Sequence, residues 1–401
     1  MKILFLISAL PDLSNQNLYS DLINQAFLHG NDVKVASPVL KGQKEGLYLE
    51  GGISVARFKS APLQGNKSFI QKGIAYLRLI YKYPLAISRH FKNETFDLIY
   101  VNSLPLEVAV VSWYLKRKYK AKLYLMLCDY LWQDIVALKV LDKNNPIIYY
   151  YRYLERLMFK TADYIGALSQ AYIDLAKSEY PFVANKNLKV IFPWSYNQEK
   201  PSDIDLVLKE FELEGKFIAV YGGNVGVAQD IDNVVNVAES CQEYEDIVFL
   251  IIGKGAKVDE VSKDVKQRQI KNVRFIDFMP KDKYLRLMSA CDIGLVSLNK
   301  DLATPNFPSK TSSLFNFSIP VVAAVDYVTD YGHYLEKNNM GLWSYSGDTV
   351  SFKNNILKLY NSPELKLEMG KNAYKFYAEN MTPGHAYSIF ANQVLGTTTN
   401  Q

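Results

Sequence analysis

The stretch FIAVYGGNVG, residues 217–226, decides the fold of this 401-residue chain. Its apolar first half predicts a buried strand, and a helical pattern from Asp232 to Cys241 follows the glycines. Such a strand, glycine turn and helix hold phosphate in α/β proteins, because the backbone N–H groups stay uncovered and a helix N-terminus favours negative charge. The glycines lack the GxGxxG spacing of dinucleotide-binding enzymes, which disfavours an oxidoreductase.

Strands and helices alternate on both sides of this stretch. The strands that we expect are Ile3–Ser8, Asp32–Ala36, Ile53–Phe58, Leu98–Val101, Ala121–Leu127, Tyr164–Ala167, Leu188–Phe192, Phe217–Tyr221, Ile247–Ile252, Val273–Phe275, Ile293–Val296 and Pro320–Ala323. The alternation predicts an α/β protein with two doubly wound, Rossmann-like domains. Ligands of such folds bind at the carboxyl ends of the strands, here in a cleft expected between the domains.

A polar, aromatic and turn-rich segment, residues 193–201, is predicted to link the two domains. We therefore expect an N-terminal domain over residues 1–198 and a C-terminal domain over residues 199–373. Residues 374–401 are predicted to form a helical segment, interrupted near Pro383, that packs back on the N-terminal domain.

The composition excludes several classes of protein. Hydrophobic residues make up 49% and charged residues 22% of the chain, as in a well-cored globular protein. A net charge of +5 is too small to indicate nucleic acid binding. The three cysteines show no CxxC spacing and the four histidines are dispersed, which predicts a reduced, cytoplasmic protein without a metal site. The apolar run Ile3–Leu10 is interpreted as a first strand rather than a secretory signal, and no run reaches the roughly 18 residues of a membrane span.

The segment Phe307-Pro308-Ser309-Lys310 carries the sharpest signal for a ligand. Lys310 is expected at a helix start, where its charge opposes the helix dipole, so its placement favours an anion nearby over a merely solvated lysine. Gly253-Lys254-Gly255 ends another expected strand and fits a turn as well as a ligand contact. Phe278 follows a third strand and would line the same edge.

Carboxylates near strand ends give one candidate and two weaker patterns. Asp129 follows the strand Ala121–Leu127, so its side chain either faces the cleft or caps a helix in the core. The two DxD patterns, at Asp203–Asp205 and Asp230–Asp232, are interpreted as linker and helix-cap residues.

A basic, aromatic helix is expected over Phe69–Phe91, with Lys72, Arg78 and Lys82 and with a kink or break at Pro84. The run Lys116–Lys122 adds further positive charge to the same domain. Such a surface fits an anionic membrane and an ordinary solvated helix face equally well.

Four segments together carry a resemblance to a known family. They are Cys128–Asp134, Tyr221–Gln229, Val273–Pro280 and Pro308–Val322. In them the chain resembles glycosyltransferases of the GT-B fold and the retaining family 4 type, in particular bacterial surface-polysaccharide enzymes similar to N-acetylfucosamine and N-acetylhexosamine transferases.

The resemblance implies a hexosyltransferase that uses a UDP-linked sugar and acts with retention, without a metal or cofactor. The donor would contact residues of the C-terminal domain, namely Gly222, Gly223, Asn224, Gly226, Gly253, Phe278, Ser309, Lys310 and Ser313. Asp129 and Lys310 would be the catalytic residues. A glycan acceptor, expected to be lipid-linked, would bind the N-terminal domain on the side of Asn102, Ser103, Lys72, Arg78 and Lys82. The protein would then work in the cytoplasm, peripherally on the inner membrane face.

One departure from the family leaves two further functions open. The family has two glutamates eight positions apart, and their places fall near Pro305 and at Ser313 here. A catalytically silent GT-B protein that binds sugar or a partner transferase is therefore the first alternative. A sugar-nucleotide 2-epimerase is the second, although the scarcity of histidine argues against it.

Overall fold

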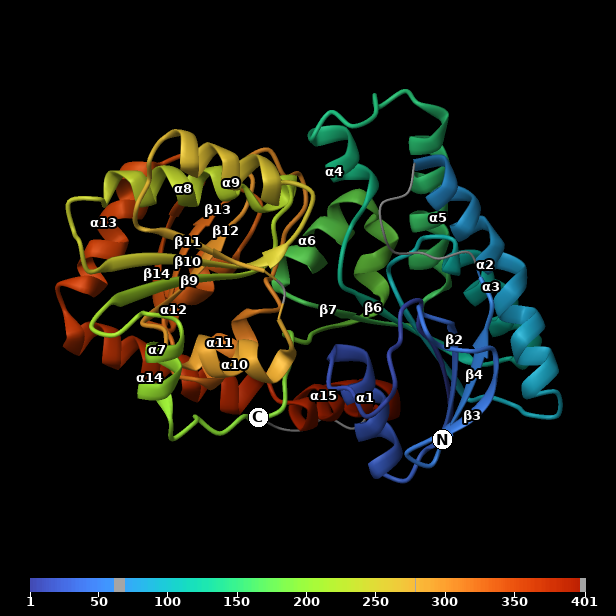
Figure 1. The fold of residues 1–401 in the computed structure, drawn as a ribbon. Helices are drawn as coiled ribbons and strands as arrows, with labels where there is room; N and C mark the ends of the chain where they lie inside the picture. The colour runs from blue at the N-terminus through green and yellow to red at the C-terminus, as the bar shows by residue number, and fades with distance from the viewer. Residues whose placement is uncertain (61–68, 278, 397–401) are drawn as a thin grey trace. The chain divides into compact units, whose positions relative to one another are not determined.

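The computed structural model describes residues 1–60, 69–277 and 279–396, without the side chains of residues 69–72. The chain forms two compact units, one of residues 1–196 and 383–401 and the other of residues 197–382 (Figure 1). Each unit is built on its own sheet with helices packed against it, so the predicted α/β class with two Rossmann-like domains is confirmed.

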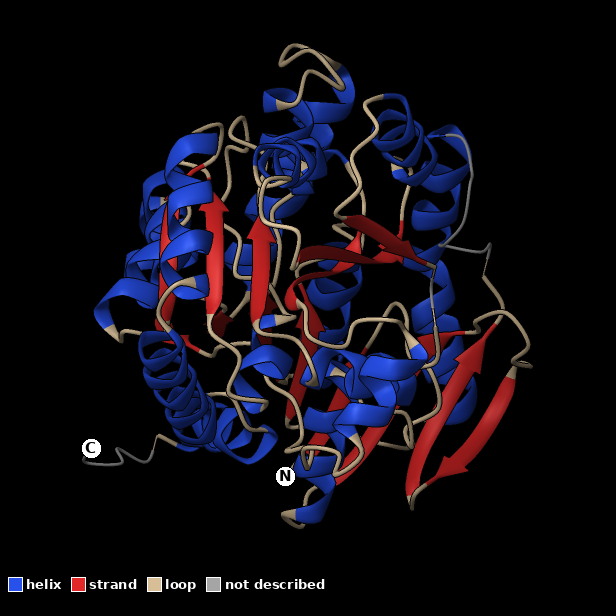
Figure 2. Cartoon of the chain, turned by 60° about the vertical axis from the view of Figure 1, so that its left-hand side comes forward, coloured by secondary structure: helices blue, strands red, loops and turns tan. Residues whose placement is uncertain are grey.

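The first unit contains an eight-stranded sheet in the order β3-β4-β2-β1-β5-β6-β7-β8. Its strands are β1 (Lys2–Leu6), β2 (Asp32–Pro38), β3 (Gly46–Glu50), β4 (Ile53–Phe58), β5 (Leu98–Asn102), β6 (Lys122–Leu127), β7 (Tyr164–Ala167) and β8 (Asn187–Val190). All neighbours are parallel except β3 and β4, which form an antiparallel pair at the sheet edge (Figure 2). The sequence did not predict β3, whose mostly exposed residues lack a buried strand's apolar run.

The helices of the first unit lie on both faces of this sheet. They are α1 (Leu18–Leu28), α2 (Phe69–His90), α3 (Val108–Tyr119), α4 (Trp132–Ala137), α5 (Pro146–Thr161), α6 (Gln170–Glu179), the 3-10 helix η1 (Pro181–Asn185) and α15 (Pro383–Leu395). The crossover through α1 runs from β1 to β2, whereas the crossover through α3 runs the opposite way, from β5 to β6. Right-handed connections therefore put α1 and α3 on opposite faces. α15 packs beside α1, and α2 and α5 pack beside α3 (Figure 1).

The second unit contains a six-stranded, fully parallel sheet in the order β11-β10-β9-β12-β13-β14. Its strands are β9 (Phe217–Asn224), β10 (Ile247–Lys254), β11 (Val273–Ile276), β12 (Ile293–Ser297), β13 (Val321–Val325) and β14 (Gly341–Tyr345). Its helices are α7 (Ile204–Glu210), η2 (Val227–Gln229), α8 (Ile231–Ser240), α9 (Val258–Gln267), α10 (Lys281–Ser289), α11 (Thr311–Asn316), α12 (Tyr331–Lys337), α13 (Thr349–Tyr360) and α14 (Pro363–Asn380). Buried aliphatic and aromatic side chains of β9, β10, α8 and α13 form one continuous core.

Two local expectations differ from the structure. The helix does not break at Pro84, and α2 continues through it, because helix neighbours and the sheet bury its inner face and outweigh the lost hydrogen bond. The last segment was expected to leave the C-terminal domain at residue 374, but α14 stays in the second unit, where it packs on α11. The chain returns to the first unit at Pro383, and the first crossing lies at residue 196 rather than 198.

A buried ion pair holds the loop that follows β1. Arg57, on β4, is 3% exposed and donates to both carboxylate oxygens of Glu50, whose side chain is 10% exposed. The same guanidinium donates to the carbonyls of Leu10 and Pro11, at 2.8 and 2.9 Å. The loop after β1 is thus fixed by side-chain hydrogen bonds.

Replacing Arg57 by Met should lower the free energy of unfolding by about 3–5 kcal/mol, because Glu50 would stay buried without its partner. The matched control is Lys2→Met, which removes a pair with Glu94 whose side chains are 44% and 31% exposed and should lower the free energy of unfolding far less. Urea unfolding of both variants measures the difference. Equal losses would show that the Arg57 pair does not hold the loop.

Candidate donor site

One pocket of the second unit lies at the carboxyl ends of β9 and β10, beside the segments that follow β11 and β12. The pocket has a volume of about 480 Å³. It is lined by Gly222, Gly223, Asn224, Ile252, Gly253, Lys254, Met279, Lys281, Tyr284, Ser309, Lys310 and Ser313. β9 lies at the point where the strand order reverses, with β10 on one side and β12 on the other. This is where open α/β sheets bind their ligands.

Bare backbone forms the floor of this pocket. Gly223 has a φ of +136°, a conformation that other residues rarely adopt. A Cβ on Gly253 would lie 1.8 Å from the carbonyl oxygen of Gly223, so β9 and β10 approach each other here as only glycine permits. The glycine at 253 is therefore required by strand packing, and the paired glycines at 223 and 253 put no side chain into the pocket.

Lys310 points to the same floor. Its Nζ lies 3.5 Å from the centre of the Tyr221 ring, and a Cβ added to Gly223 would be 3.9 Å from that nitrogen. Burial in the surrounding protein lowers the pKa of Lys310 to about 7. The helix that follows, α11, has only six residues and therefore a weak dipole. The predicted repulsion between this dipole and Lys310 is thus a weak argument for a nearby anion. The case for an anion rests on the position of the ammonium group instead.

Two more lysines and two serines complete the polar lining. Lys254 follows the glycine of β10, and Lys281 begins α10. Ser309 and Ser313 lie beside Lys310, and no aspartate or glutamate is among the described residues of this lining. The sequence analysis missed Lys281, because nothing in the sequence brings the start of α10 next to β9. Phe278 lies outside the described residues.

Gly226 lies outside the lining, in the turn that follows β9. α8 begins only at Ile231, so the glycines do not open directly into a helix. Asp230 precedes α8 as expected, but its carboxylate makes no capping bond and accepts instead from the Ser346 hydroxyl. In the described residues no group of three or more His, Cys, Asp or Glu side chains could hold a metal.

Asp129 occupies the carboxyl edge of the sheet in the first unit. Its side chain is exposed rather than buried in the core. The surrounding protein, and then the charge of Asp134, raise the pKa of Asp129 to about 7. The Ser103 hydroxyl accepts from the backbone N–H of Asp129 and donates to its carbonyl, at 3.1 and 2.8 Å. Ser103 is thus a buried positioning residue, and the neighbouring Asn102 is buried as well.

A buried glutamate fixes the segment after Asp129. Glu155, on α5, accepts hydrogen bonds from Trp132 Nε1, Gln133 Nε2 and the Tyr180 hydroxyl, at 2.9, 3.0 and 2.8 Å. Burial raises the pKa of Glu155 to about 7. Three donors on one carboxylate account for its position without a ligand. No local pattern in the sequence marks this contact, which joins α5 to residues that lie 22–25 positions away.

The basic residues of the first unit differ in their availability. Arg78 is exposed on α2 and Lys82 is partly exposed there, whereas the Lys72 side chain lies outside the described residues. Lys116 is not part of a free basic surface, because it pairs with Asp163 at 2.6 Å and donates to the Thr161 carbonyl. In the part of the chain that the structure describes, no helix is long and apolar enough to cross a membrane.

Known proteins resemble the chain in sequence, most clearly in the second unit. Residues 205–376, which form most of the second unit, match the family "Glycosyl transferases group 1". The putative colanic acid biosynthesis glycosyl transferase WcaI of Escherichia coli is 26% identical over 45% of this chain and 45% of its own length. The probable glycosyltransferase WbjE of Pseudomonas aeruginosa is 22% identical over 70% of both chains.

Solved structures show the same fold. Sucrose-phosphate synthase from Thermosynechococcus elongatus superposes with a TM-score of 0.77 at 13% identity, over 99% of this chain and all of that one. HepE from Anabaena, solved with UDP-glucose, superposes with a TM-score of 0.68 at 16% identity and the same coverage. The chain therefore has the GT-B fold, and the match to the glycosyltransferase group 1 family covers residues 205–376.

The ammonium group of Lys310 should titrate near pH 7, because burial disfavours its charged form. Competitive labelling with acetic anhydride between pH 5 and 11, followed by peptide mass spectrometry, measures this pKa. In denaturing urea the same lysine should return to its ordinary value near 10.5. Identical pKa values of Lys310 in the folded and the unfolded protein would contradict the burial of its ammonium group beside Tyr221.

Proposed function

We propose that the protein is a glycosyltransferase that moves a hexosyl group from a UDP-linked sugar to a glycan acceptor. The carrying observation is the pocket at the ends of β9 and β10 and beside the segment that follows β12, where three glycines and three lysines meet. The group 1 match of the second unit, and the UDP-glucose bound by HepE, support a sugar nucleotide as its ligand.

The diphosphate of the donor is assigned to the floor of this pocket. Gly222, Gly223 and Asn224 offer backbone groups there, and the turn at Gly226 follows them. Lys310 supplies the principal positive charge, with Ser309 and Ser313 beside it. The nucleoside is assigned to the side of Gly253. Phe278 is proposed to contact the nucleoside on the basis of the sequence alone. Lysines and backbone dipoles can stabilise a leaving diphosphate, so the reaction is proposed to need no metal.

The acceptor is assigned to the first unit. Asp129 is proposed to contact the acceptor hydroxyl, and its raised pKa suits a group that exchanges a proton near neutral pH. Retention of the anomeric configuration follows the family resemblance, with an oxygen of the departing phosphate helping to deprotonate the acceptor. Synthesis of a bacterial surface polysaccharide is proposed from the colanic acid relative.

A lipid-linked acceptor is proposed from the surface of α2, α3 and α5. Large apolar side chains are exposed on these neighbouring helices, namely Ile74, Leu77, Tyr81, Leu85, Trp113, Tyr114, Tyr149 and Tyr153. The guanidinium of Arg117 lies 4.1 Å from the Trp113 ring, and Arg78 and Lys82 add positive charge. Aromatic and basic side chains together favour the headgroup region of an anionic membrane. Peripheral attachment there would bring the first unit to its acceptor.

A catalytically silent GT-B protein is the second candidate. It is favoured by the pocket lining, because Ser313 stands where the family has its second glutamate and no described lining residue is acidic. A silent protein would bind the nucleotide without turning it over, so binding and turnover have to be measured separately.

UDP should bind to the wild-type protein, and Lys310→Met should weaken binding by about 1.5–3 kcal/mol, the value of a hydrogen bond to a charged group. Calorimetric affinity should also fall between pH 7 and pH 9, since the proton leaves Lys310 above its pKa of about 7 and an anion prefers the protonated form. Lys310→Met should lose this pH dependence. Lys371→Met, an exposed lysine of α14, is the control that should change neither quantity.

Turnover of radiolabelled UDP-hexoses should proceed in the presence of EDTA. Lys310→Met should lower kcat/KM by a factor that corresponds to a loss of about 2–4 kcal/mol of transition-state stabilisation. UDP binding without any release of UDP from a panel of UDP-sugars would favour the silent protein. Unchanged binding and turnover in Lys310→Met would remove Lys310 from the site.

The protein should sediment with vesicles that contain anionic lipid more than with neutral vesicles at low salt. Each basic residue near such a surface contributes about 1 kcal/mol, so the double change of Arg78 and Lys82 to Gln should weaken binding by about 2 kcal/mol. The same double change at Lys371 and Lys375, both exposed on α14, is the control. Equal and negligible sedimentation with both kinds of vesicle would show that the α2 surface is only solvated.

A further inference from the structure

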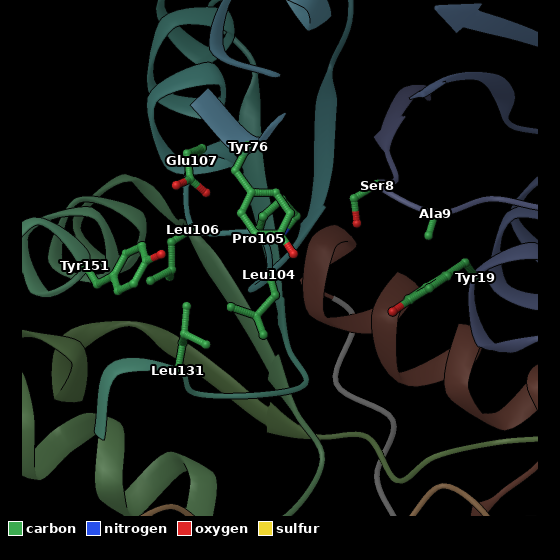
Figure 3. A pocket seen from close by; sticks show the side chains of 10 residues that line it. All are labelled: Ser8, Ala9, Tyr19, Tyr76, Leu104, Pro105, Leu106, Glu107, Leu131 and Tyr151. Carbon is green, nitrogen blue, oxygen red and sulfur yellow. The ribbon is translucent and has the colours of Figure 1, made fainter. Parts of the chain in front are cut away.

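A second pocket lies at the carboxyl edge of the sheet in the first unit. Its volume is about 270 Å³, and its lining consists of Ser8, Ala9, Tyr19, Tyr76, Leu104, Pro105, Leu106, Glu107, Leu131 and Tyr151 (Figure 3). Ser8 and Ala9 follow β1, and the run from Leu104 to Glu107 follows β5. The strand order reverses between β1 and β5, so this pocket is at the topological switch point of its own sheet.

Glu107 is the unusual member of this lining. It is 1% exposed, and its Oε2 has no hydrogen-bond partner in the described residues. Its side chain makes no capping bond to α3, and no lysine or arginine is part of the described lining. Burial raises the pKa of Glu107 to about 7. A buried polar atom without a partner is costly, so a ligand that supplies hydrogen-bond donors would remove this cost.

The neighbours of Glu107 restrict the chemistry of that ligand. Tyr76 and Tyr151 lie near Glu107 on one side of the pocket, and Ser8 and Tyr19 lie on the other side (Figure 3). A carboxylate without a cation nearby disfavours a phosphate group. The volume is below the roughly 300–1,000 Å³ of drug-sized ligand sites, so it suits one ring rather than a chain. Aromatic faces beside a hydrogen-bond acceptor suit a molecule with apolar C–H faces and hydroxyl edges.

The pocket is also close to the proposed acceptor chemistry. Leu131 belongs to its lining and is two residues from Asp129. The charge of Asp129 contributes to the raised pKa of Tyr19, after burial and Cys128. The α2 helix supplies Tyr76, so the helix proposed to meet the membrane also reaches this pocket.

We propose that this pocket binds one uncharged pyranose ring of the acceptor, with Glu107 accepting hydrogen bonds from ring hydroxyls. This assignment rests on the proposed transfer reaction. It means that the acceptor is a sugar already attached to its carrier, and not the phosphate of the carrier itself. Glu107 acts as a specificity-determining residue and takes no part in bond making. The other occupants that a carboxylate allows, above all an amino sugar bound through its ammonium group, are outcomes of the test.

Saturation-transfer NMR on the full chain tests this assignment with methyl glycosides as probes. The panel contains methyl glucoside, galactoside, mannoside, fucoside, rhamnoside and N-acetylglucosaminide, the cationic methyl 2-amino-2-deoxyglucoside, and methyl phosphate. At least one neutral glycoside should give signals with the wild-type protein. Glu107→Leu should weaken that binding at least tenfold, whereas Glu107→Gln, which keeps an acceptor oxygen, should weaken it less. Glu179→Leu, an exposed position on α6, is the matched control and should bind as the wild type does.

Two further measurements separate a binding role from a structural role and from the donor site. The melting temperature of Glu107→Leu should equal or exceed that of the wild type, because a buried carboxylate with an unpartnered oxygen is lost. UDP affinity should stay unchanged in both Glu107 variants. Conversely, Lys310→Met should still give glycoside signals equal to those of the wild type. Glycoside binding without UDP binding in the wild type would contradict the proposed donor and leave this inference standing.

Four results would overturn the inference. They are the absence of signals from every neutral glycoside, a preference for the amino sugar or methyl phosphate, unchanged glycoside binding in Glu107→Leu, and a lower melting temperature in that variant.

Discussion

The close approach of β9 and β10 is the constraint on which the donor pocket depends. Gly253 faces the Gly223 carbonyl with no room for a side chain, so two strand ends meet at glycines that leave the same space free of side chains. Lys310 reaches that space from the segment before α11, and its position over the Tyr221 ring depends on the path of β9. Any side chain at residue 253 would push these strands apart, and with them the groups that line the pocket.

Both sheets place ionisable groups with shifted pKa values at their carboxyl edges. Lys310 in the second unit loses its proton more easily than an ordinary lysine, and Asp129 and Glu107 in the first unit keep theirs longer than ordinary carboxylic acids. For Lys310 and Glu107 enclosure by protein disfavours the charged form, and a ligand with matching charge or hydrogen bonds would restore it. Glu155 shows the contrast, since three hydrogen-bond donors of the protein itself already surround its carboxylate.

Most of the fold could be predicted because buried parallel strands are short apolar runs bounded by turn residues. β4 and β7 begin and end at the predicted residues, whereas the exposed edge strand β3 has no such run. The site could be predicted only where one segment carries it, as with Gly222, Gly223 and Lys310. Lys281 and Glu107 enter their pockets through tertiary packing of helices and loops, and the Arg57 contact with Glu50 depends on strand register. Nothing in the local sequence marks these contacts.

Hydrogen exchange of the full chain with and without UDP tests the central claim most directly, because it reports where the nucleotide meets the backbone. Added UDP should slow exchange of the amides at residues 222–226, 253–255 and 309–313, and this protection should disappear in Lys310→Met. Slower exchange confined to other segments, or none at saturating UDP, would contradict the account of the donor site.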